Sequence, residues 1–218
     1  MPAGARVSRL GDALQAPAGI ALGPDGAVYV AEQVAPGAGQ VVRLVDADDD
    51  GQAERVEPVA AGLASPRGLA GLTPAGQAPV LLVATREGLV VVEAGQARLA
   101  GRLGSDAGRA NDVVVGTDGL VYVTEGAAGD GEPQPGAVGR FDPAALLTAG
   151  RPAQGELFVS GLRSAGGIAF SPSGAIYVAD SGQGWSFRAD VPDELNVLLG
   201  GGDYGWPRAW PRRAVWPG

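Results

Sequence analysis

The chain has 218 residues, a formal net charge of −8, and neither cysteine nor histidine. This length suits one domain with a sizeable core. The acidic balance argues against nucleic acid and anionic membranes as partners. The missing cysteines exclude disulfides and thiolate metal sites, and the missing histidines remove the commonest general base at neutral pH. With 37 Gly and 17 Pro, long helices are disfavoured and turns should be frequent.

The beginning of the chain, MPAGARVSRL, has no apolar stretch long enough for a signal peptide, and no 18-residue apolar span follows. We therefore expect no export address and no membrane-spanning helix in the sequence as it stands. Residues 5–10 (ARVSRL) have the pattern of a fourth β-strand with no first three strands ahead of it. This arrangement is typical of propellers that close by strand exchange between their termini.

One unit recurs four times along the chain. It reads PAGIALGPDGAVYVAE at 17–32, RANDVVVGTDGLVYVTEG at 109–126 and AGGIAFSPSGAIYVADSG at 165–182, with a degenerate copy at 65–88. Corresponding positions are 49, 44 and 55 residues apart, at Gly19, Gly68, Asp112 and Gly167. A repeat of this length predicts one structural unit per copy.

Each unit predicts four short antiparallel strands. In the first unit they cover 19–22, 27–31, 41–45 and 55–60, and a P-D-G turn separates the first two. The second strand contains V-Y-V-A, which is rich in β-branched and aromatic residues. Third strands are also expected at 89–93 and 138–141, and fourth strands at 96–99 and 156–159. Four such strands per unit are typical of a β-propeller blade.

We therefore interpret residues 1–218 as a single all-β domain, a β-propeller. Its blade-like units are expected near 17–63, 64–106, 107–162 and 163–207, followed by a Trp- and Pro-rich tail at 208–218. Four blades lie at the lower end of the range that propellers use. We expect an open arc that lacks about two blades of a ring.

An acidic loop follows the third strand of the first unit. Its sequence, VDADDDGQAERVE at 45–57, places Asp46, Asp48 and Asp50 at alternating positions, with Glu57 at the twelfth position of the loop. This is the spacing of an EF-hand calcium loop. No helix is expected beside it, so we interpret it as the tip of a hairpin. It predicts either a calcium site or a solvated acidic turn.

Acidic residues also recur with the blades. Glu32, Glu125 and Asp180 occupy one column, at the end of the second strand in three units. Acids in this column either line a cation site at the mouth of the propeller or accept hydrogen bonds from the backbone of loops between blades.

The C-terminal part carries the most specific motif. VPDELNVLLGGGDYGWP at 191–207 resembles the D-E-L-N…N-Y-G-W-P signature of the soluble quinoprotein sugar dehydrogenases, the glucose and L-sorbosone dehydrogenase family. Upstream, SGLRSAGGIAFSPSGAIYVADSGQGW at 160–185 is similar to that family's G-x-R-N-P-x-G segment and the D/E-x-G loop that follows. The resemblance is specific over about 160–207 and only blade-like over 17–126.

The resemblance implies a six-bladed propeller that holds pyrroloquinoline quinone (PQQ) with calcium and oxidises aldoses or sorbosone. By position, Arg163 matches an arginine that contacts the quinone, and Ser164 stands where the family has a second contact, an asparagine. The backbone carbonyls of Ser181, Gly182 and Gln183 fall in the loop that would hold the calcium of the cofactor.

The same resemblance implies a second calcium position. Glu194 and the carbonyl of Tyr204 match it, and Asp203 adds an oxygen nearby. The family further implies a small sugar as partner and a periplasmic or secreted location.

The sequence departs from the family at the catalytic base. The family histidine falls in the region equivalent to 103–111, which here reads LGSDAGRAN. Asp106 and Asp112 are carboxylates nearby, and a desolvated carboxylate can act as a base. Asp106 is therefore the catalytic candidate, with an exposed loop residue as the alternative. Without the histidine, we expect that the chain alone does not oxidise sugars.

Two other functions stay open. The first is a calcium-stabilised propeller that serves as a binding or scaffold module without catalysis. The second is a lactonase-like metallohydrolase, for which Asn111, Asn196 and the strand-end acids supply the residue types that a central metal requires.

Overall fold

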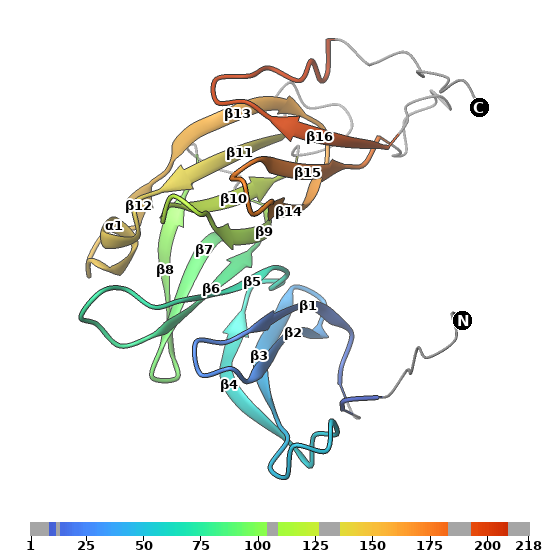
Figure 1. Ribbon diagram of the computed structural model, residues 1–218, viewed down its shortest axis with the longest axis vertical. Helices are drawn as coiled ribbons and strands as arrows, with labels where there is room; N and C mark the ends of the chain where they lie inside the picture. Colours follow the sequence, from blue (N-terminus) through green and yellow to red (C-terminus); the bar gives the residue numbers. More distant parts are fainter. Residues whose placement is uncertain (1–8, 12–13, 104–108, 127–135, 183–192, 209–218) are drawn as a thin grey trace.

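The computed structural model describes residues 9–11, 14–103, 109–126, 136–182 and 193–208. Within these ranges the backbone is almost entirely β-structure, arranged as four sheets that follow one another around a common hub (Figure 1). This is a β-propeller arrangement, so the predicted all-β fold is confirmed.

The four sheets follow the order of the sequence. The first consists of β1 (Pro17–Leu22), β2 (Val28–Ala35), β3 (Ala38–Val45) and β4 (Arg55–Leu63). The second consists of β5 (Leu69–Leu72), β6 (Val80–Thr85), β7 (Gly88–Glu93) and β8 (Gln96–Arg102), with the short β12 (Ala153–Gln154) parallel to β8. The third consists of β9 (Ala110–Val115), β10 (Val121–Glu125), β11 (Gly136–Phe141) and β13 (Glu156–Leu162). The fourth consists of β14 (Ala165–Phe170), β15 (Ile176–Asp180) and β16 (Glu194–Leu198).

The strands of each sheet fall within one predicted unit except β12, which belongs to the third unit in sequence and pairs with the second sheet. The segment DELN, first considered for its motif, contributes to β16, the third strand of the fourth blade. The predicted strand at 5–10 lies mostly outside the described residues. Its last two residues, Arg9 and Leu10, are not in a strand.

The repeated D-G and tyrosine of the sequence form one local structure. In the first blade the Asp25 carboxylate accepts hydrogen bonds from the Ala27 amide and the Tyr29 hydroxyl, beside the turn that Gly26 completes at φ 78°. In the third blade Asp118 does the same for the Leu120 amide and the Tyr122 hydroxyl. The turn therefore fixes the register of the first hairpin in each of these blades.

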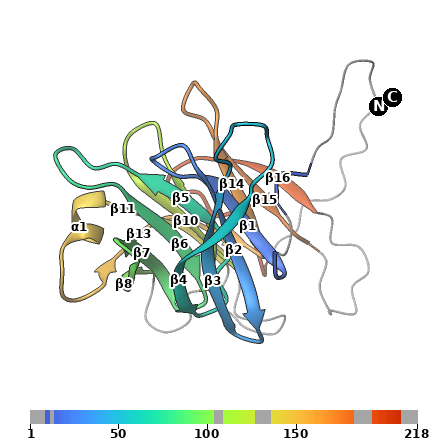
Figure 2. The same cartoon turned by 90° about the horizontal axis from the view of Figure 1, so that it is seen from below.

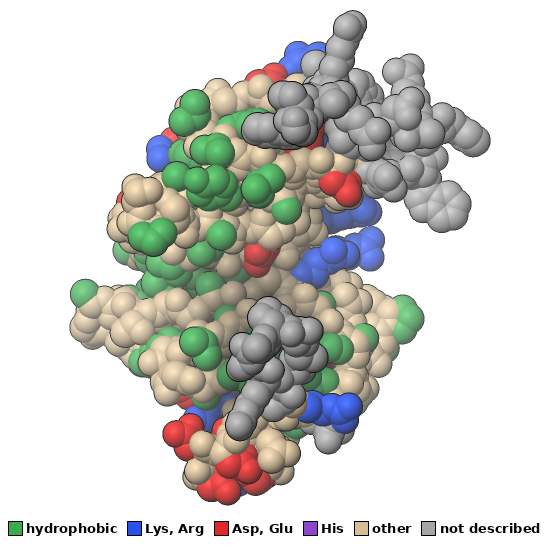
Figure 3. All heavy atoms as spheres, turned by 45° about the vertical axis from the view of Figure 1, so that its right-hand side comes forward, with side chains coloured by type: hydrophobic (Ala, Val, Ile, Leu, Met, Phe, Trp, Pro, Cys, Tyr) green, Lys and Arg blue, Asp and Glu red, His purple; other side chains and the backbone are tan. Residues whose placement is uncertain are grey.

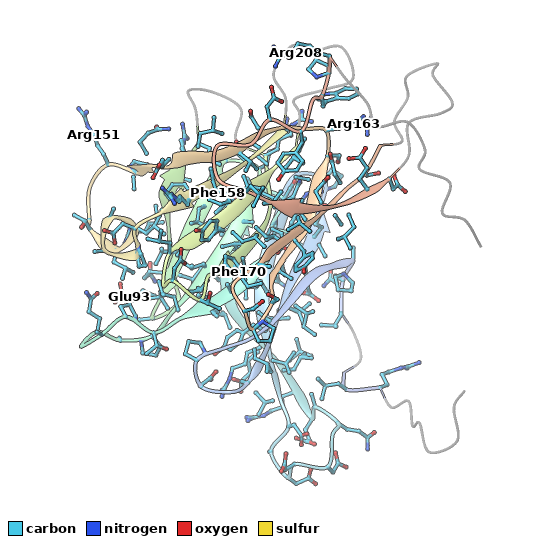
Figure 4. The ribbon with its side chains drawn as sticks, turned by 45° about the horizontal axis from the view of Figure 1, so that its top comes forward. Glu93, Arg151, Phe158, Arg163, Phe170 and Arg208 are labelled. Atoms are coloured by element: carbon cyan, nitrogen blue, oxygen red, sulfur yellow. The ribbon has the colours of Figure 1, made fainter. Side chains whose placement is uncertain are left out.

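Apolar side chains fill the spaces between consecutive blades. The contact of the first two blades contains Ala31, Val41 and Val83, and that of the second and third contains Leu82, Val91 and Val123. The third contact is built around Tyr122, whose ring meets Phe158 and Phe170 edge-on at centroid distances of 5.2 and 5.1 Å. The two phenylalanines are labelled in Figure 4.

The outer faces of the first and last blades remain largely uncovered. Among the described residues, no apolar cluster joins the fourth blade to the first. Leu10 and Leu14 pack against part of the first blade, around Val42 and Leu44. Large apolar side chains of both end blades stay exposed, among them Ile20 at 69% and Leu22 at 68%, and Leu195 at 72% and Leu199 at 74%.

One short helix was not expected from the sequence. It is α1 (Pro143–Leu147), which begins after Asp142, whose carboxylate accepts a hydrogen bond from the Ala144 amide. Figure 2 shows that it lies at the outer edge of the blades, away from β1. In the described part of the chain, no helix is long and apolar enough to cross a membrane.

Candidate functional site

The candidate site lies at one end of the sheets, which we call the connection end. Because neighbouring strands run antiparallel, the loops between blades and the loops between second and third strands all gather there. A cavity of about 450 Å³ opens at the hub and is lined by residues of all four blades. Its polar side chains are Gln33, Arg67, Asn111 and Asp112.

The repeated glycines allow the first strands to meet closely at the hub. A Cβ atom on Gly19 would clash with the carbonyl oxygen of Arg67, and one on Gly68 would clash with Asp112. The third blade has Asp112 in the same column, so its carboxylate lies at the crowded centre. In the fourth blade an added Cβ on Gly167 would lie 3.8 Å from Asp112, so the crowding requires glycine at Gly19 and Gly68.

Asp112 connects the third and fourth blades. Its carboxylate accepts hydrogen bonds from the amides of Val113 at 2.9 Å and Ile168 at 3.0 Å. The adjacent Asn111 side-chain amide donates to the carbonyl oxygen of Ala165 at 2.7 Å. Burial raises the pKa of Asp112, although the two backbone donors oppose this shift. Asp106, the catalytic candidate, lies outside the described residues.

The acids at the ends of the second strands accept hydrogen bonds from backbone amides. Glu32 is 2% exposed and accepts hydrogen bonds from the Gln15 amide at 2.7 Å and the Gln40 side chain at 2.8 Å. The Asp180 carboxylate accepts hydrogen bonds from the backbone amides of Arg163 and Ser164. Burial raises the pKa of Glu125 to about 7, with a backbone hydrogen bond from Leu103 opposing the shift. These contacts support the hydrogen-bonding alternative rather than a cation site.

Arg163 is fixed at the connection end of the fourth blade. It is 9% exposed, and its guanidinium donates to the carbonyl oxygen of Ser181 at 2.9 Å. The same group lies 5.4 Å from the centre of the Trp206 ring, a cation–π contact. The Arg163 amide donates to Asp180 at 2.9 Å. The side chain therefore contacts groups from two segments, Ser181 after β15 and Trp206 after β16.

The other predicted quinone contacts surround this arginine. The Ser164 amide donates to Asp180 at 2.6 Å, and the Ser164 carbonyl accepts from the Ser181 amide at 3.2 Å. The Gly182 amide and the Ser181 hydroxyl both donate to Asp193, at 3.0 and 3.1 Å. Gln183 lies outside the described residues.

At the second predicted calcium position, Glu194 and Tyr204 have separate hydrogen-bond partners. Glu194 pairs with Asp180 across β15 and β16, and its carboxylate accepts from the Asn196 side chain at 3.3 Å. Burial and the charge of Asp180 raise the pKa of Glu194. The Tyr204 hydroxyl donates to the Val197 carbonyl at 2.7 Å, and none of the described hydrogen bonds joins Tyr204 to Glu194.

The acidic residues that come together at the hairpin tip differ from those predicted. Oxygens of Asp46, Asp48, Asp50 and Glu54 lie within 4.8 Å of one another. Glu57 is not in this group, which corrects the predicted twelfth ligand. It belongs to β4, where its carboxylate pairs with Arg43 at 3.7 Å and Arg55 at 3.5 Å. The strand begins at residue 55 and turns Glu57 away from the tip, so Glu54, at the ninth position, takes its place.

The lactonase alternative is weakened by the same geometry. Asn111 lines the cavity, but Asn196 lies on β16 beside Glu194 and does not line it. The oxygen ligands that a central metal needs are therefore not brought together by the residues considered for it.

Sequence reasoning missed two features of this end. One is the contact of Trp206 with Arg163, which only the fold brings together. The other is Glu54, which the spacing of the acids could have indicated as well as Glu57.

Comparisons with known proteins identify the fold. No family model matches the chain, and no curated protein matches its sequence. Among solved structures, the calcium structure of a Trichoderma reesei enzyme of carbohydrate-active family AA12 gives a TM-score of 0.68 at 20% identity, over 91% of this chain and 57% of that one. The PQQ-bound aldose sugar dehydrogenase from Streptomyces coelicolor gives 0.63 at 21% identity, over 93% and 66%. A gluconolactonase from Xanthomonas campestris gives 0.58 at 20% identity, over 84% and 62%.

The chain therefore has the β-propeller fold of PQQ-dependent sugar dehydrogenases, as the C-terminal motif predicted. The chain spans 57% and 66% of the lengths of these two proteins. Because the gluconolactonase shares the fold, the likeness defines the architecture and leaves the activity to the residues of the site.

Proposed function

We propose that this chain is a quinoprotein sugar dehydrogenase-like β-propeller, which binds PQQ and calcium at the connection end and has aldoses or sorbosone as its substrate class. The observation that carries this proposal is the fixed guanidinium of Arg163, held by the Ser181 carbonyl and the Trp206 ring. An oriented guanidinium suits a carboxylate of the quinone, because charge-assisted hydrogen bonds are strong and directional. The C-terminal motif supports the same assignment.

The donors at this end fit a ligand with several carboxylates. Arg67 and Arg109 are exposed on the connections that precede the second and third blades, at the same end of the sheets. The backbone carbonyls of Ser181 and Gly182 are the described loop oxygens that would hold calcium, and the Ser181 carbonyl also accepts a hydrogen bond from Arg163. When bound, PQQ would supply the group that accepts hydride.

The weak point is the proton acceptor. Asp112 lines the cavity and burial raises its pKa, which favours proton uptake. Both of its oxygens, however, already accept backbone hydrogen bonds. Loss of a positioned base costs about 10²–10⁴-fold in rate. We therefore expect that the chain binds the quinone without turning over sugar above the background of free cofactor.

The test is reconstitution with PQQ and calcium, followed by equilibrium binding of the quinone and by dye reduction with glucose, other aldoses and sorbosone. Arg163→Lys should weaken quinone binding at least tenfold, because lysine lacks the planar fork and the stacking face. Arg151→Lys, at an exposed position far from the site (Figure 4), is the matched control and should bind as the parent does. Absence of quinone binding by the parent would overturn the proposal.

A second candidate is a calcium-stabilised propeller module without catalysis. The grouping of four carboxylates at the hairpin tip favours it, because hard divalent cations prefer several oxygen ligands. Calcium-dependent stability with no quinone binding would select this candidate. Either protein would act in a periplasmic or secreted setting with a small sugar as partner, and neither needs nucleic acid or membrane.

A further inference from the structure

Three arginines come together at the connection end of the second and third blades. Arg67 precedes β5, Arg86 lies in the turn between β6 and β7, and Arg109 precedes β9. The first two lie on adjacent backbone, because the Arg67 amide donates to Ala84 at 2.9 Å and the Arg86 amide donates to Ala64 at 2.8 Å. Figure 3 shows arginine side chains projecting together beside the hollow of this face.

One of these arginines lines the hub cavity. Arg67 lines it together with Asn111, which is two residues beyond Arg109. The backbones of the two connections meet there, since Gly68 lies against Asp112. The cavity thus has one cationic side chain in its lining, Arg67, and Arg109 is two residues from the lining residue Asn111.

Their charge is not neutralised by neighbouring side chains. Four other arginines form salt bridges, namely Arg43, Arg55, Arg140 and Arg208. Within the described residues, the side chains of Arg67, Arg86 and Arg109 are exposed and make no ion pair or hydrogen bond. The described acids at this end include Asp112, which is engaged by backbone amides, the exposed Glu87, and Glu125, which lies opposite Ala110 in the third blade. In a chain with a formal charge of −8, such a group focuses positive potential at a cavity.

The rest of the cavity suits a polyhydroxylated ligand. Gln33 offers a side-chain amide, and Asn111, whose amide nitrogen donates to Ala165, offers its side-chain carbonyl oxygen; Gly166 and Gly167 also line the cavity. The volume of about 450 Å³ falls within the range of small-molecule sites, about 300–1,000 Å³. Amides bind hydroxyls, whereas exposed guanidinium groups bind carboxylate or phosphate.

We propose that this cavity binds a small anionic carbohydrate, a sugar acid or a sugar phosphate, with its anion on Arg67 and with Arg86 and Arg109 adding to the local positive potential. The carbohydrate part of this inference rests on the proposed function, which it narrows from neutral aldoses to acidic sugars. The anionic part rests on the arginines alone.

The test is calorimetric titration of the purified chain with glucuronate, glucose 6-phosphate, inorganic phosphate and glucose, in the presence of EDTA and without quinone. At least one of the two acidic sugars should bind at least tenfold more tightly than glucose, and its binding should weaken as salt is raised. Whether glucuronate or glucose 6-phosphate binds more tightly identifies the anion. Arg67→Gln should reduce that binding at least tenfold, with an unchanged melting temperature because the side chain is exposed.

Arg55→Gln, on the distant and exposed β4, is the matched control and should bind as the parent does. Equal affinity for glucose and the acidic sugars, or unchanged binding by Arg67→Gln, would overturn the inference. Inorganic phosphate that binds as tightly as glucose 6-phosphate would overturn its carbohydrate part. Because no quinone or calcium is present, these results are independent of the reconstitution that tests the dehydrogenase assignment.

Discussion

The Asp112 carboxylate accepts the backbone amide of Ile168 at 3.0 Å and so joins the third blade to the fourth through a single side chain. The corresponding positions of the other blades are glycines, of which Gly19 and Gly68 make a close backbone approach without any such bond. The third blade, which has Asp112 where the other blades have glycine, therefore has a polar connection to the fourth blade at the hub. Burial raises the pKa of this carboxyl because desolvation disfavours its charged form. The hydrogen bonds from the two backbone amides oppose this shift.

Replacing Asp112 with alanine should lower the free energy of unfolding by about 2–4 kcal/mol, because the amides of Val113 and Ile168 lose their acceptor in a partly buried site. Asp112→Asn keeps one acceptor oxygen and should lose less. Urea denaturation measures both. Glu93→Gln, at the exposed end of β7, is the control and should change stability by less than about 0.5 kcal/mol. Full stability of Asp112→Ala would show that the hub does not depend on this bond.

Glu125 should make the protein less stable as the pH rises toward neutrality. Its pKa is raised to about 7 in the folded protein, compared with about 4.3 in an unfolded chain. Between these values the folded state binds more protons than the unfolded state, so the free energy of unfolding falls as pH increases. The loss approaches about 3.7 kcal/mol as an upper limit. Glu125→Gln should remove this slope and stabilise the protein at pH 8.

The measurement is the midpoint of urea unfolding from pH 4.5 to pH 8 for the parent and Glu125→Gln. Glu87→Gln, at an exposed position on the same end of the molecule, should leave the slope of the parent intact. Parallel profiles for the parent and Glu125→Gln would contradict the assignment of the slope to this residue.

The strands of the blades could be predicted from the sequence, whereas the side-chain contacts between distant segments could not. Alternating apolar residues and the D-G turns located β2, β7 and β13, because register within a hairpin depends on neighbours in sequence. The contact of Arg163 with Trp206 joins two blade connections that are 43 residues apart, and no local pattern encodes it. Glu57 was assigned to the acidic loop by spacing alone, but the start of β4 before it reverses the direction of its side chain.

Calcium should stabilise the protein through the acidic hairpin tip. At a hundredfold excess over Kd, binding to the folded state adds about 2.7 kcal/mol, so the melting temperature should rise when calcium replaces EDTA. Asp48→Asn and Glu54→Gln each remove an oxygen ligand and should reduce the rise. Glu57→Gln lies two residues into β4 and should retain it in full. Identical melting temperatures with calcium and with EDTA would rule out a site there.

The uncovered face of the last blade should make the chain self-associate. In β16 the side chains alternate, so Leu198 packs against the third blade whereas Leu195 and Val197 face outward at 72% and 51% exposure. Exposed apolar patches on a sheet face promote association. The double substitution Leu195→Thr and Val197→Thr keeps β-branched or strand-compatible residues and removes apolar surface. It should lower light scattering and binding of a hydrophobic dye while leaving the melting temperature within a few degrees of the parent.

The control for the exposed position of Leu195 is Leu82→Thr, which alters a leucine that is fully buried between the second and third blades. That variant should lose about 2–4 kcal/mol of stability, because a buried leucine is replaced by a smaller side chain whose hydroxyl lacks a partner. If the double variant also unfolds at a markedly lower temperature, Leu195 and Val197 are covered in solution. If it scatters light as the parent does, association occurs through another surface, for which Ile20 and Leu22 on the first blade are the exposed alternatives.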